Sequence, residues 1–381
     1  MGDATPMSDR ASDLQTLPLR PLWRIHPDPN RLSSASGQEQ AGGAYDPSTN
    51  RLFIGSMQGY FRCLRASDGQ ELWRTPISGG VRGAAVLNRG RVYFGSDSGH
   101  LIALDANTGS EIWKYRVQGA ITEPPVIDGS TLYFVDGTNA VYALGTLSGA
   151  WKWQHRREQP ARFAVAGESG ITVADGRVYV GFSDGHLLAF AATDGAVLWD
   201  TDLAKGAVEF RDVDATPALV GGTLFAASLA GGIYGLDPAT GKLRWRQSEM
   251  TNVVQLRAYD EDLLVARANG EIFRFDPKSG APRWRVDLGR AGGPPSAFIP
   301  LGEALTLTVP RGGLYVLDAG TGQPLGRFRP GGGISARPAA GTDGRLFVMS
   351  RVGVLYAFGA SANGHTPQPT FPLSTGPGRG L

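Results

Sequence analysis

Short apolar runs alternate along the chain with turns rich in Gly, Asp and Ser. The runs contain mostly β-branched, aliphatic and aromatic residues, as in residues 131–136 (TLYFVD) and 140–145 (AVYALG). Neither the runs nor the segments between them show a helical period. Short apolar runs of this composition, bounded by turn residues, are typical of β-strands joined by tight turns. The pattern therefore predicts an all-β protein.

The same pattern recurs as a long repeat. Its clearest copy is residues 92–116, VYFGSDSGHLIALDANTGSEIWKYR, and further copies begin at residues 52, 132, 178, 224, 263 and 305. Each copy, with the segment before it, contains four predicted strands. Four short strands in each repeat of about 40 residues are typical of a β-propeller blade.

Two residue types mark each repeat. A turn glycine occurs at Gly69, Gly109, Gly149, Gly195, Gly241, Gly280 and Gly322, at intervals of 40, 40, 46, 46, 39 and 42 residues. A tryptophan follows the glycine in all but the last copy, at Trp73, Trp113, Trp153, Trp199, Trp245 and Trp284, whereas the last copy has Gly326 instead. A large apolar ring with one N–H is suited to packing between neighbouring blades.

The two ends of the repeat region complement each other. Residues 334–340 and 346–358 align with the first three strands of a further unit that lacks a tryptophan strand. Such a strand, Leu22–Ile25 with Trp23, precedes the first complete unit. Pairing these segments would complete an eighth blade and remove exposed sheet edges. We therefore predict one eight-bladed propeller over residues 18–359, with residues 1–17 and 360–381 as disordered tails.

Composition narrows the classes of function. The chain has 41% hydrophobic residues and a net charge of +2, which favours a folded core and gives no reason to expect a nucleic-acid partner. Its one cysteine excludes an internal disulfide, and no apolar stretch reaches the length of a transmembrane helix. The first residues, MGDATPMSDRASDLQT, contain no signal peptide or lipobox cysteine. Taken literally, this start predicts a cytoplasmic protein, and we expect a monomer.

No catalytic, cofactor or metal site is expected from the motifs. Residues 181–185 match G-x-S-x-G, but they occupy the same predicted hairpin as residues 55–59 and 95–99, so a structural turn is expected. The histidines show no metal-ligand spacing. Cys63 occupies a repeat position that holds small residues in most units, which predicts burial rather than reactivity.

Two connections between repeats are longer than the others. The two intervals of 46 residues place the additional residues at 154–171 and 201–217, between the tryptophan strand of one unit and the first strand of the next. In a propeller, such connections emerge on the same face as the hairpins that join the second and third strands. Insertions concentrated on one face indicate a binding surface.

The long connections carry a resemblance to the BamB family, the propeller lipoproteins of the outer-membrane β-barrel assembly machinery. Residues 212–217 (DVDATP) are close to the family's D-V-D-T-T-P, and residues 163–169 (FAVAGES) are similar to its L-x-L-R-G-E-S. The resemblance covers about residues 18–359, including the count of eight blades. Ala166 stands where the family has an arginine.

The resemblance implies a non-catalytic scaffold in the periplasm, at the inner face of the outer membrane. Its implied partner is the set of POTRA domains of BamA. Phe163 and Val165 would make apolar contacts with this partner, and Asp212 and Asp214 would supply carboxylates.

Other interpretations remain open at this point. The repeat also resembles that of quinoprotein dehydrogenases, which bind pyrroloquinoline quinone, although this chain lacks their adjacent cysteines and long insertions. A propeller that binds an unrelated partner or a glycan is a further alternative. Asp212 and Asp214 could simply form a turn, and Phe163 and Val165 could fill a blade junction.

Overall fold

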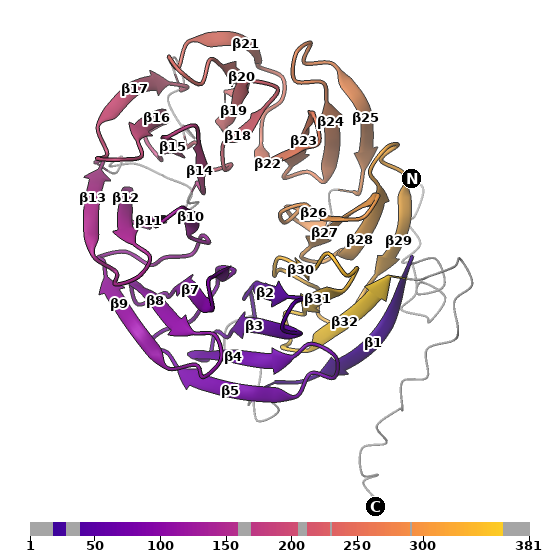
Figure 1. The fold of residues 1–381 in the computed structure, drawn as a ribbon. Coiled ribbons are helices and arrows are strands. Elements are labelled where there is room, and N and C mark those ends of the chain that lie inside the picture. Colours follow the sequence, from indigo (N-terminus) through magenta and orange to yellow (C-terminus); the bar gives the residue numbers. More distant parts are fainter. Residues whose placement is uncertain are drawn as a thin grey trace, which may run out of the picture.

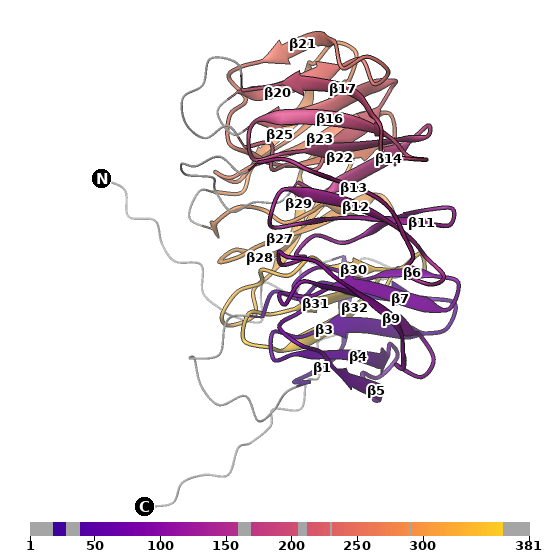
Figure 2. The same cartoon turned by 90° about the vertical axis from the view of Figure 1, so that its left-hand side faces the viewer.

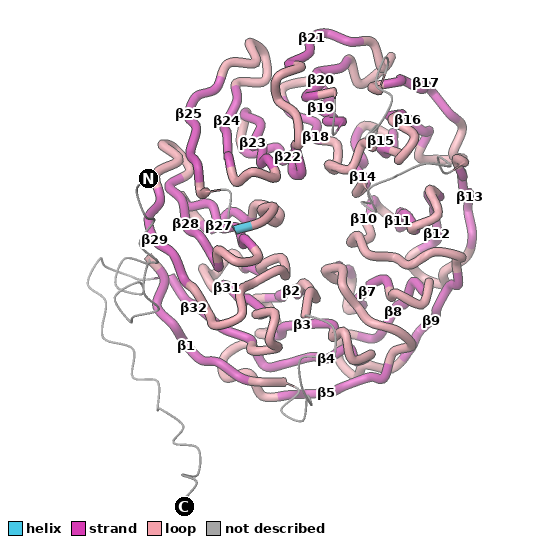
Figure 3. The backbone as a smooth tube through the Cα atoms, turned by 180° about the vertical axis from the view of Figure 1, so that it is seen from behind, coloured by secondary structure: helices cyan, strands magenta, loops and turns pink. Residues whose placement is uncertain are grey.

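The protein is a ring of eight four-stranded antiparallel sheets (Figure 1). The computed structural model describes residues 18–27, 39–158, 169–204, 212–228, 231–289 and 292–360. Of the expected tails, 1–17 and 360–381, all residues except Ala360 lie outside these described residues. Within them, strands and loops make up nearly all of the backbone (Figure 3). The prediction of an eight-bladed propeller is confirmed.

Each blade has its first strand nearest the axis and its fourth strand at the rim (Figure 1). Blade 1 contains β2 (Gly43–Asp46), β3 (Arg51–Gly55), β4 (Tyr60–Arg65) and β5 (Glu71–Pro76). Blade 2 contains β6 (Val86–Asn88), β7 (Arg91–Gly95), β8 (His100–Asp105) and β9 (Glu111–Arg116). Blade 3 contains β10 (Val126–Asp128), β11 (Thr131–Asp136), β12 (Ala140–Gly145) and β13 (Trp151–Arg156). Blade 4 contains β14 (Ile171–Ala174), β15 (Arg177–Gly181), β16 (His186–Ala191) and β17 (Val197–Asp202).

The second half of the ring repeats this arrangement. Blade 5 contains β18 (Ala218–Val220), β19 (Thr223–Ser228), β20 (Gly232–Leu236) and β21 (Leu243–Gln247). Blade 6 contains β22 (Val253–Tyr259), β23 (Asp262–Arg267), β24 (Glu271–Phe275) and β25 (Pro282–Asp287). Blade 7 contains β26 (Ile299–Leu301), β27 (Ala304–Val309), β28 (Gly313–Asp318) and β29 (Pro324–Phe328). Blade 8 contains β30 (Ala339–Ala340), β31 (Leu346–Met349), β32 (Leu355–Ala360) and β1 (Leu19–Ile25).

Blade 8 closes the ring with strands from both ends of the repeat region. β1 pairs antiparallel with β32, from Leu19 opposite Ala360 to Ile25 opposite Leu355. The predicted closure by the N-terminal tryptophan strand is confirmed, and the last strand ends at Ala360, one residue beyond the predicted boundary. Both segments are thereby held by hydrogen bonds instead of exposing sheet edges.

The hydrophobic core lies between neighbouring blades, which are stacked side by side around the ring (Figure 2). One cluster joins Tyr93 and Trp113 of blade 2 to Leu132, Phe134 and Tyr142 of blade 3. Other clusters join other adjacent blades in the same way. Each sheet is therefore buried on both faces by its neighbours, which explains why the second and third strands are apolar along most of their length.

The repeat tryptophans stabilise these junctions through the turn glycines. Trp113 packs against Gly149 of the next blade so closely that a Cβ atom on this glycine would lie 2.8 Å from the ring. Its indole N–H donates to the carbonyl of Thr146 at 3.1 Å. The equivalent N–H···O=C bond is made by Trp23, Trp73, Trp153, Trp199 and Trp284. Trp245 lies beside Gly280 in the corresponding place. The tryptophan of each of these blades thus packs against the turn of the next blade.

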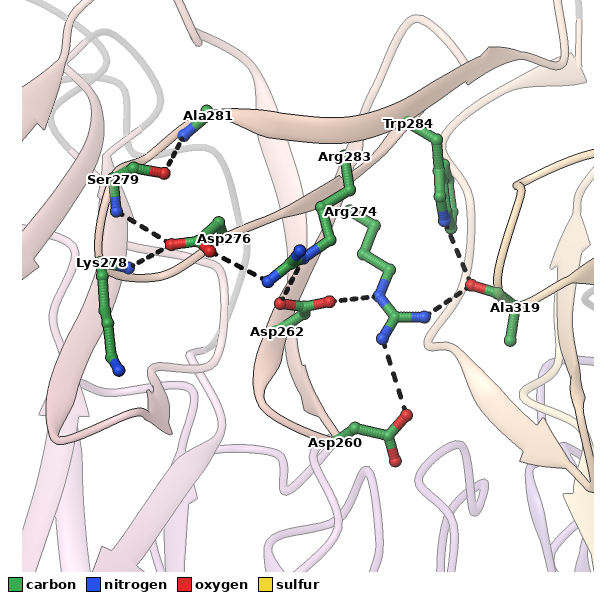
Figure 4. Close-up of polar contacts among 10 residues, drawn as sticks. All are labelled: Asp260, Asp262, Arg274, Asp276, Lys278, Ser279, Ala281, Arg283, Trp284 and Ala319. Carbon is green, nitrogen blue, oxygen red and sulfur yellow. Dashed lines mark hydrogen bonds and ion pairs between the residues drawn. The ribbon is translucent and has the colours of Figure 1, made fainter.

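The junction of blades 6 and 7 adds charged groups to this contact (Figure 4). The carbonyl of Ala319 accepts hydrogen bonds from Trp284 at 3.1 Å and from Arg274 at 2.7 Å. Arg274 and Arg283 both donate to the buried carboxylate of Asp262, at 2.6 and 2.8 Å. Arg274 thus connects the carbonyl of Ala319 in blade 7 with the carboxylate of Asp262 in blade 6.

Gly326 replaces a tryptophan where the blade architecture makes that residue unnecessary. It lies in the outer strand of blade 7, opposite Val316. The neighbouring blade 8 has no hairpin between its third and fourth strands, because β32 and β1 are distant in sequence. Among the residues that the structure describes, no turn glycine therefore lies where a tryptophan at position 326 would pack.

Candidate functional site

The two long connections begin on the predicted face. The amide of Arg157, after β13, donates to the carbonyl of Asn139 in the hairpin between the second and third strands of blade 3. The amide of Leu203, after β17, donates to Gly185 in the equivalent hairpin of blade 4. Both connections therefore start beside these hairpins, as predicted. Phe163 and Val165 lie outside the described residues.

An ion-pair network fixes the start of the first connection to blade 4. The guanidinium of Arg157 contacts the carboxylates of Asp184 and Asp200 at 2.6 and 2.9 Å. Asp200 also lies 2.5 Å from Nδ1 of His186. An arginine that bridges two carboxylates holds its backbone in place more firmly than a single surface pair. This network was not predicted from the sequence. The only indication of it there is that several charged residues occur on the predicted hairpin face.

The far ends of the two connections lie side by side. The amide of Gly170 donates to Oγ1 of Thr216 at 3.1 Å, although 46 residues separate them in sequence. The hydroxyl of Thr172 donates to the carbonyl of Pro217 at 2.5 Å. Residues 169–172 and 215–217 therefore lie side by side, mostly buried, and we call them the paired connections.

Val213 has a structural role that the repeat explains. Its side chain is 1% exposed and packs on Gly181, where an added Cβ would lie 2.5 Å from Cγ1 of the valine. Val81 packs on Gly55 and Ile121 on Gly95 in the same manner. The glycine that ends the second strand is thus needed for this close approach.

The aspartates beside Val213 are not required by the repeat. The residues that flank Val81 are Gly80 and Arg82, and those that flank Ile121 are Ala120 and Thr122. The packing of the blade therefore accepts neutral or cationic residues at the positions of Asp212 and Asp214. Blade packing alone therefore does not dictate the carboxylate of Asp214, which is only partly buried.

These two carboxylates differ in exposure. Asp212 is 1% exposed, whereas Asp214 is partly buried. Burial raises the pKa of the Asp214 carboxyl to about 7, and the negative charge of Asp212 contributes to the same shift. Two nearby acids in a poorly solvated place favour protonation of one of them. A cation brought close to Asp214 would reverse that preference and be held by it.

The motifs that resemble catalytic sites are parts of the scaffold. Residues 181–185 form the hairpin between β15 and β16, as predicted, and Ser183 accepts a hydrogen bond from Asn139 at 2.7 Å. Cys63 is fully buried in β4, and burial raises the pKa of its thiol to about 12. Over the described ranges, no group of three or more His, Cys, Asp or Glu side chains is arranged to hold a metal ion. No helix in the same ranges could span a membrane.

The closed ring, the split blade and the tryptophan–glycine junctions define the class as a β-propeller of the PQQ-like repeat type. Residues 20–94 and 59–286 match the sequence profile of the family described as outer membrane protein assembly factor BamB. The chain belongs to this family.

Individual relatives are similar over shorter segments. BamB of Vibrio cholerae is 34% identical over 87 residues, which is 22% of each chain. BamB of Escherichia coli K12 is 33% identical over 89 residues, 22% of this chain and 23% of its own. BamB of Legionella pneumophila is 25% identical over 188 residues, 48% of each chain. The matched regions thus span between about a fifth and a half of these curated relatives.

Two solved structures share the fold. BamB from Moraxella catarrhalis superposes with a TM-score of 0.73 at 22% identity, over 90% of this chain and 99% of that chain. Quinohemoprotein alcohol dehydrogenase from Comamonas testosteroni superposes with a TM-score of 0.68 at 14% identity, over 94% of this chain and 78% of that chain. Identities this low show the propeller fold alone.

Proposed function

We propose that the protein is a non-catalytic scaffold of outer-membrane protein assembly, and that it docks POTRA domains of a BamA-type partner in the periplasm. The observation that carries this proposal is the pair of carboxylates at 212 and 214, which the repeat does not require, in a member of the BamB family. They adjoin the paired connections, on the face where the two insertions begin.

The electrostatics of Asp214 suit a basic partner residue. Near neutral pH its carboxyl is part-protonated, because burial and Asp212 raise its pKa to about 7. A lysine or arginine placed beside it would lower that pKa, and docking would then release a proton. Phe163 and Val165 are proposed to add apolar contact, so that charge gives orientation and apolar area gives affinity.

The test replaces Asp212 and Asp214 together by Asn, which preserves side-chain shape. Affinity for the POTRA domains of the same organism's BamA is measured by titration calorimetry. Truncating a hot spot typically costs about 2 kcal/mol or more, so we expect roughly thirtyfold weaker binding. The control is Asp128→Asn, which removes an exposed carboxylate at the end of β10, on the opposite face.

Two outcomes would contradict the proposal. One is a double variant that unfolds at the same urea concentration as the parent and still binds POTRA domains with unchanged affinity. The other is catalysis: the parent protein, supplied with pyrroloquinoline quinone and Ca²⁺, would reduce a redox dye in the presence of alcohols. We expect no such reduction, because the proposed function is to bind a partner protein and requires no redox reaction.

A further inference from the structure

A large cavity lies on the axis of the ring, away from the paired connections. Its volume is about 810 Å³, and it is lined by the innermost strands of blades 1, 2, 6, 7 and 8. The lining reaches Gly302 and Gly344, which lie in the turns between first and second strands. Those turns are on the face opposite the hairpins between second and third strands. The cavity therefore opens away from the proposed docking surface.

The inner part of this cavity is crossed by an ion pair. Arg337, which precedes β30 of blade 8, contacts Glu123, which precedes β10 of blade 3, at 3.2 Å. The two residues are 214 positions apart in sequence. On the shorter path around the ring, blades 1 and 2 lie between blade 8 and blade 3. Their side chains thus meet near the axis and give the cavity a floor. Arg337 thus already has a carboxylate partner.

A second arginine lines the same cavity without a partner. Arg257 belongs to β22, the innermost strand of blade 6. Among the residues that the structure describes, its guanidinium makes no hydrogen bond and no ion pair. Its side chain is exposed, so a ligand that enters the cavity can reach the guanidinium. An exposed cation with no carboxylate beside it attracts an anion.

The remaining walls are mostly apolar. Ala84, Val86 and Ile299 line the cavity with other aliphatic, glycine and proline residues, and Tyr45, Thr342 and Arg337 add polar groups. Cavities of about 300–1,000 Å³ with apolar walls and a few fixed polar groups are typical sites for small molecules. The cavity therefore combines one accessible guanidinium with mostly apolar walls.

We propose that the axial cavity binds a small organic carboxylate with an apolar body. The carboxylate would accept two parallel hydrogen bonds from Arg257, in the geometry that guanidinium groups favour. The apolar body would lie against the walls formed by Ala84, Val86 and Ile299. Arg337 would remain paired with Glu123 and act as the floor. This site is independent of the proposed docking function, because it opens on the other face.

The experiment compares a carboxylate with its neutral isostere on the full chain. Binding of 1-naphthoate and 1-naphthamide is measured by calorimetry. We expect the acid to bind one to one and at least tenfold more tightly than the amide. A second pair, N-acetyl-trialanine with a free or an amidated C-terminus, distinguishes a peptide carboxylate from a free organic acid. Acetate, which has no apolar body, should bind at least tenfold more weakly than naphthoate.

Variants assign the effect to Arg257. Arg257→Gln should weaken naphthoate binding at least tenfold, while Arg257→Lys should retain part of it through the positive charge. The matched control is Arg311→Gln, which removes an exposed arginine from a hairpin of blade 7 outside this cavity. Because Arg257 has no described partner, its loss should leave the urea midpoint unchanged. Equal binding of acid and amide, equal binding by Arg257→Gln and the parent, or no binding of either acid at millimolar concentration would each refute the proposal.

Discussion

The contact between Trp23 and blade 1 offers a direct measure of how firmly the ring is closed. Trp23 is partly buried, donates its indole N–H to the carbonyl of Ala66 at 3.0 Å, and packs on Gly69. Replacing a buried Trp by Ala costs about 3–5 kcal/mol. Partial burial lowers this to about 2–3 kcal/mol for Trp23→Ala, of which about 1 kcal/mol is the hydrogen bond.

The matched control is Trp151→Ala at the rim of blade 3. Trp151 is 57% exposed, so its loss should change the free energy of unfolding by less than about 1 kcal/mol. Urea unfolding, followed by tryptophan fluorescence and circular dichroism, gives the midpoint and slope for each variant. Deletion of residues 1–27, which removes β1 entirely, should lower the midpoint further and promote aggregation through the exposed edge of β32. If Trp23→Ala unfolds at the same urea concentration as Trp151→Ala, the ring is not held closed by this contact.

Two further predictions concern the turn glycines and the paired acids. Gly149→Ala and Gly129→Ala both place a side chain at positive φ, +68° and +57°, but only the first also meets a tryptophan ring. We therefore expect a loss of about 1 kcal/mol for Gly129→Ala and at least about 3 kcal/mol for Gly149→Ala, measured by urea unfolding; equal losses would contradict the packing role of the glycine. For Asp214, the raised pKa means that the folded chain binds this proton more tightly than the unfolded chain, so the contribution of Asp214 to stability should be largest below about pH 4 and be lost as the pH rises through 7. Asp214→Asn should remove a decline on the order of 2 kcal/mol in unfolding measured from pH 4 to 8, whereas Asp128→Asn should keep it.

The fold could be predicted because each blade carries its own copy of the residues that build it. The tryptophan of one unit packs against the turn glycine of the next. The repeat therefore predicts both the order of the strands within a blade and the contact between blades. Even the exception at Gly326 follows from the split blade once the pairing of β1 and β32 is known.

The sites could be predicted only in part, because they depend on residues that the repeat does not supply. The sequence indicated the face of the long connections, but it gave no sign that Asp212 is buried or that Thr216 contacts Gly170. The axial pair of Arg337 and Glu123 joins unrelated positions of two distant blades, and its geometry exists only after the ring has formed. Contacts of this kind carry no local pattern in the chain.

The pairing of β1 with β32 also sets the order of events during synthesis. β1 emerges early from the ribosome, but its partner strand β32 is made some 330 residues later. β1 therefore has no strand to pair with for a period on the order of tens of seconds. Blades 1 to 7 can form meanwhile from neighbouring segments, since each draws its four strands from one stretch of chain. The strand that bears Trp23 can thus dock only after β32 has been made, although it is the first strand of the ring to be translated.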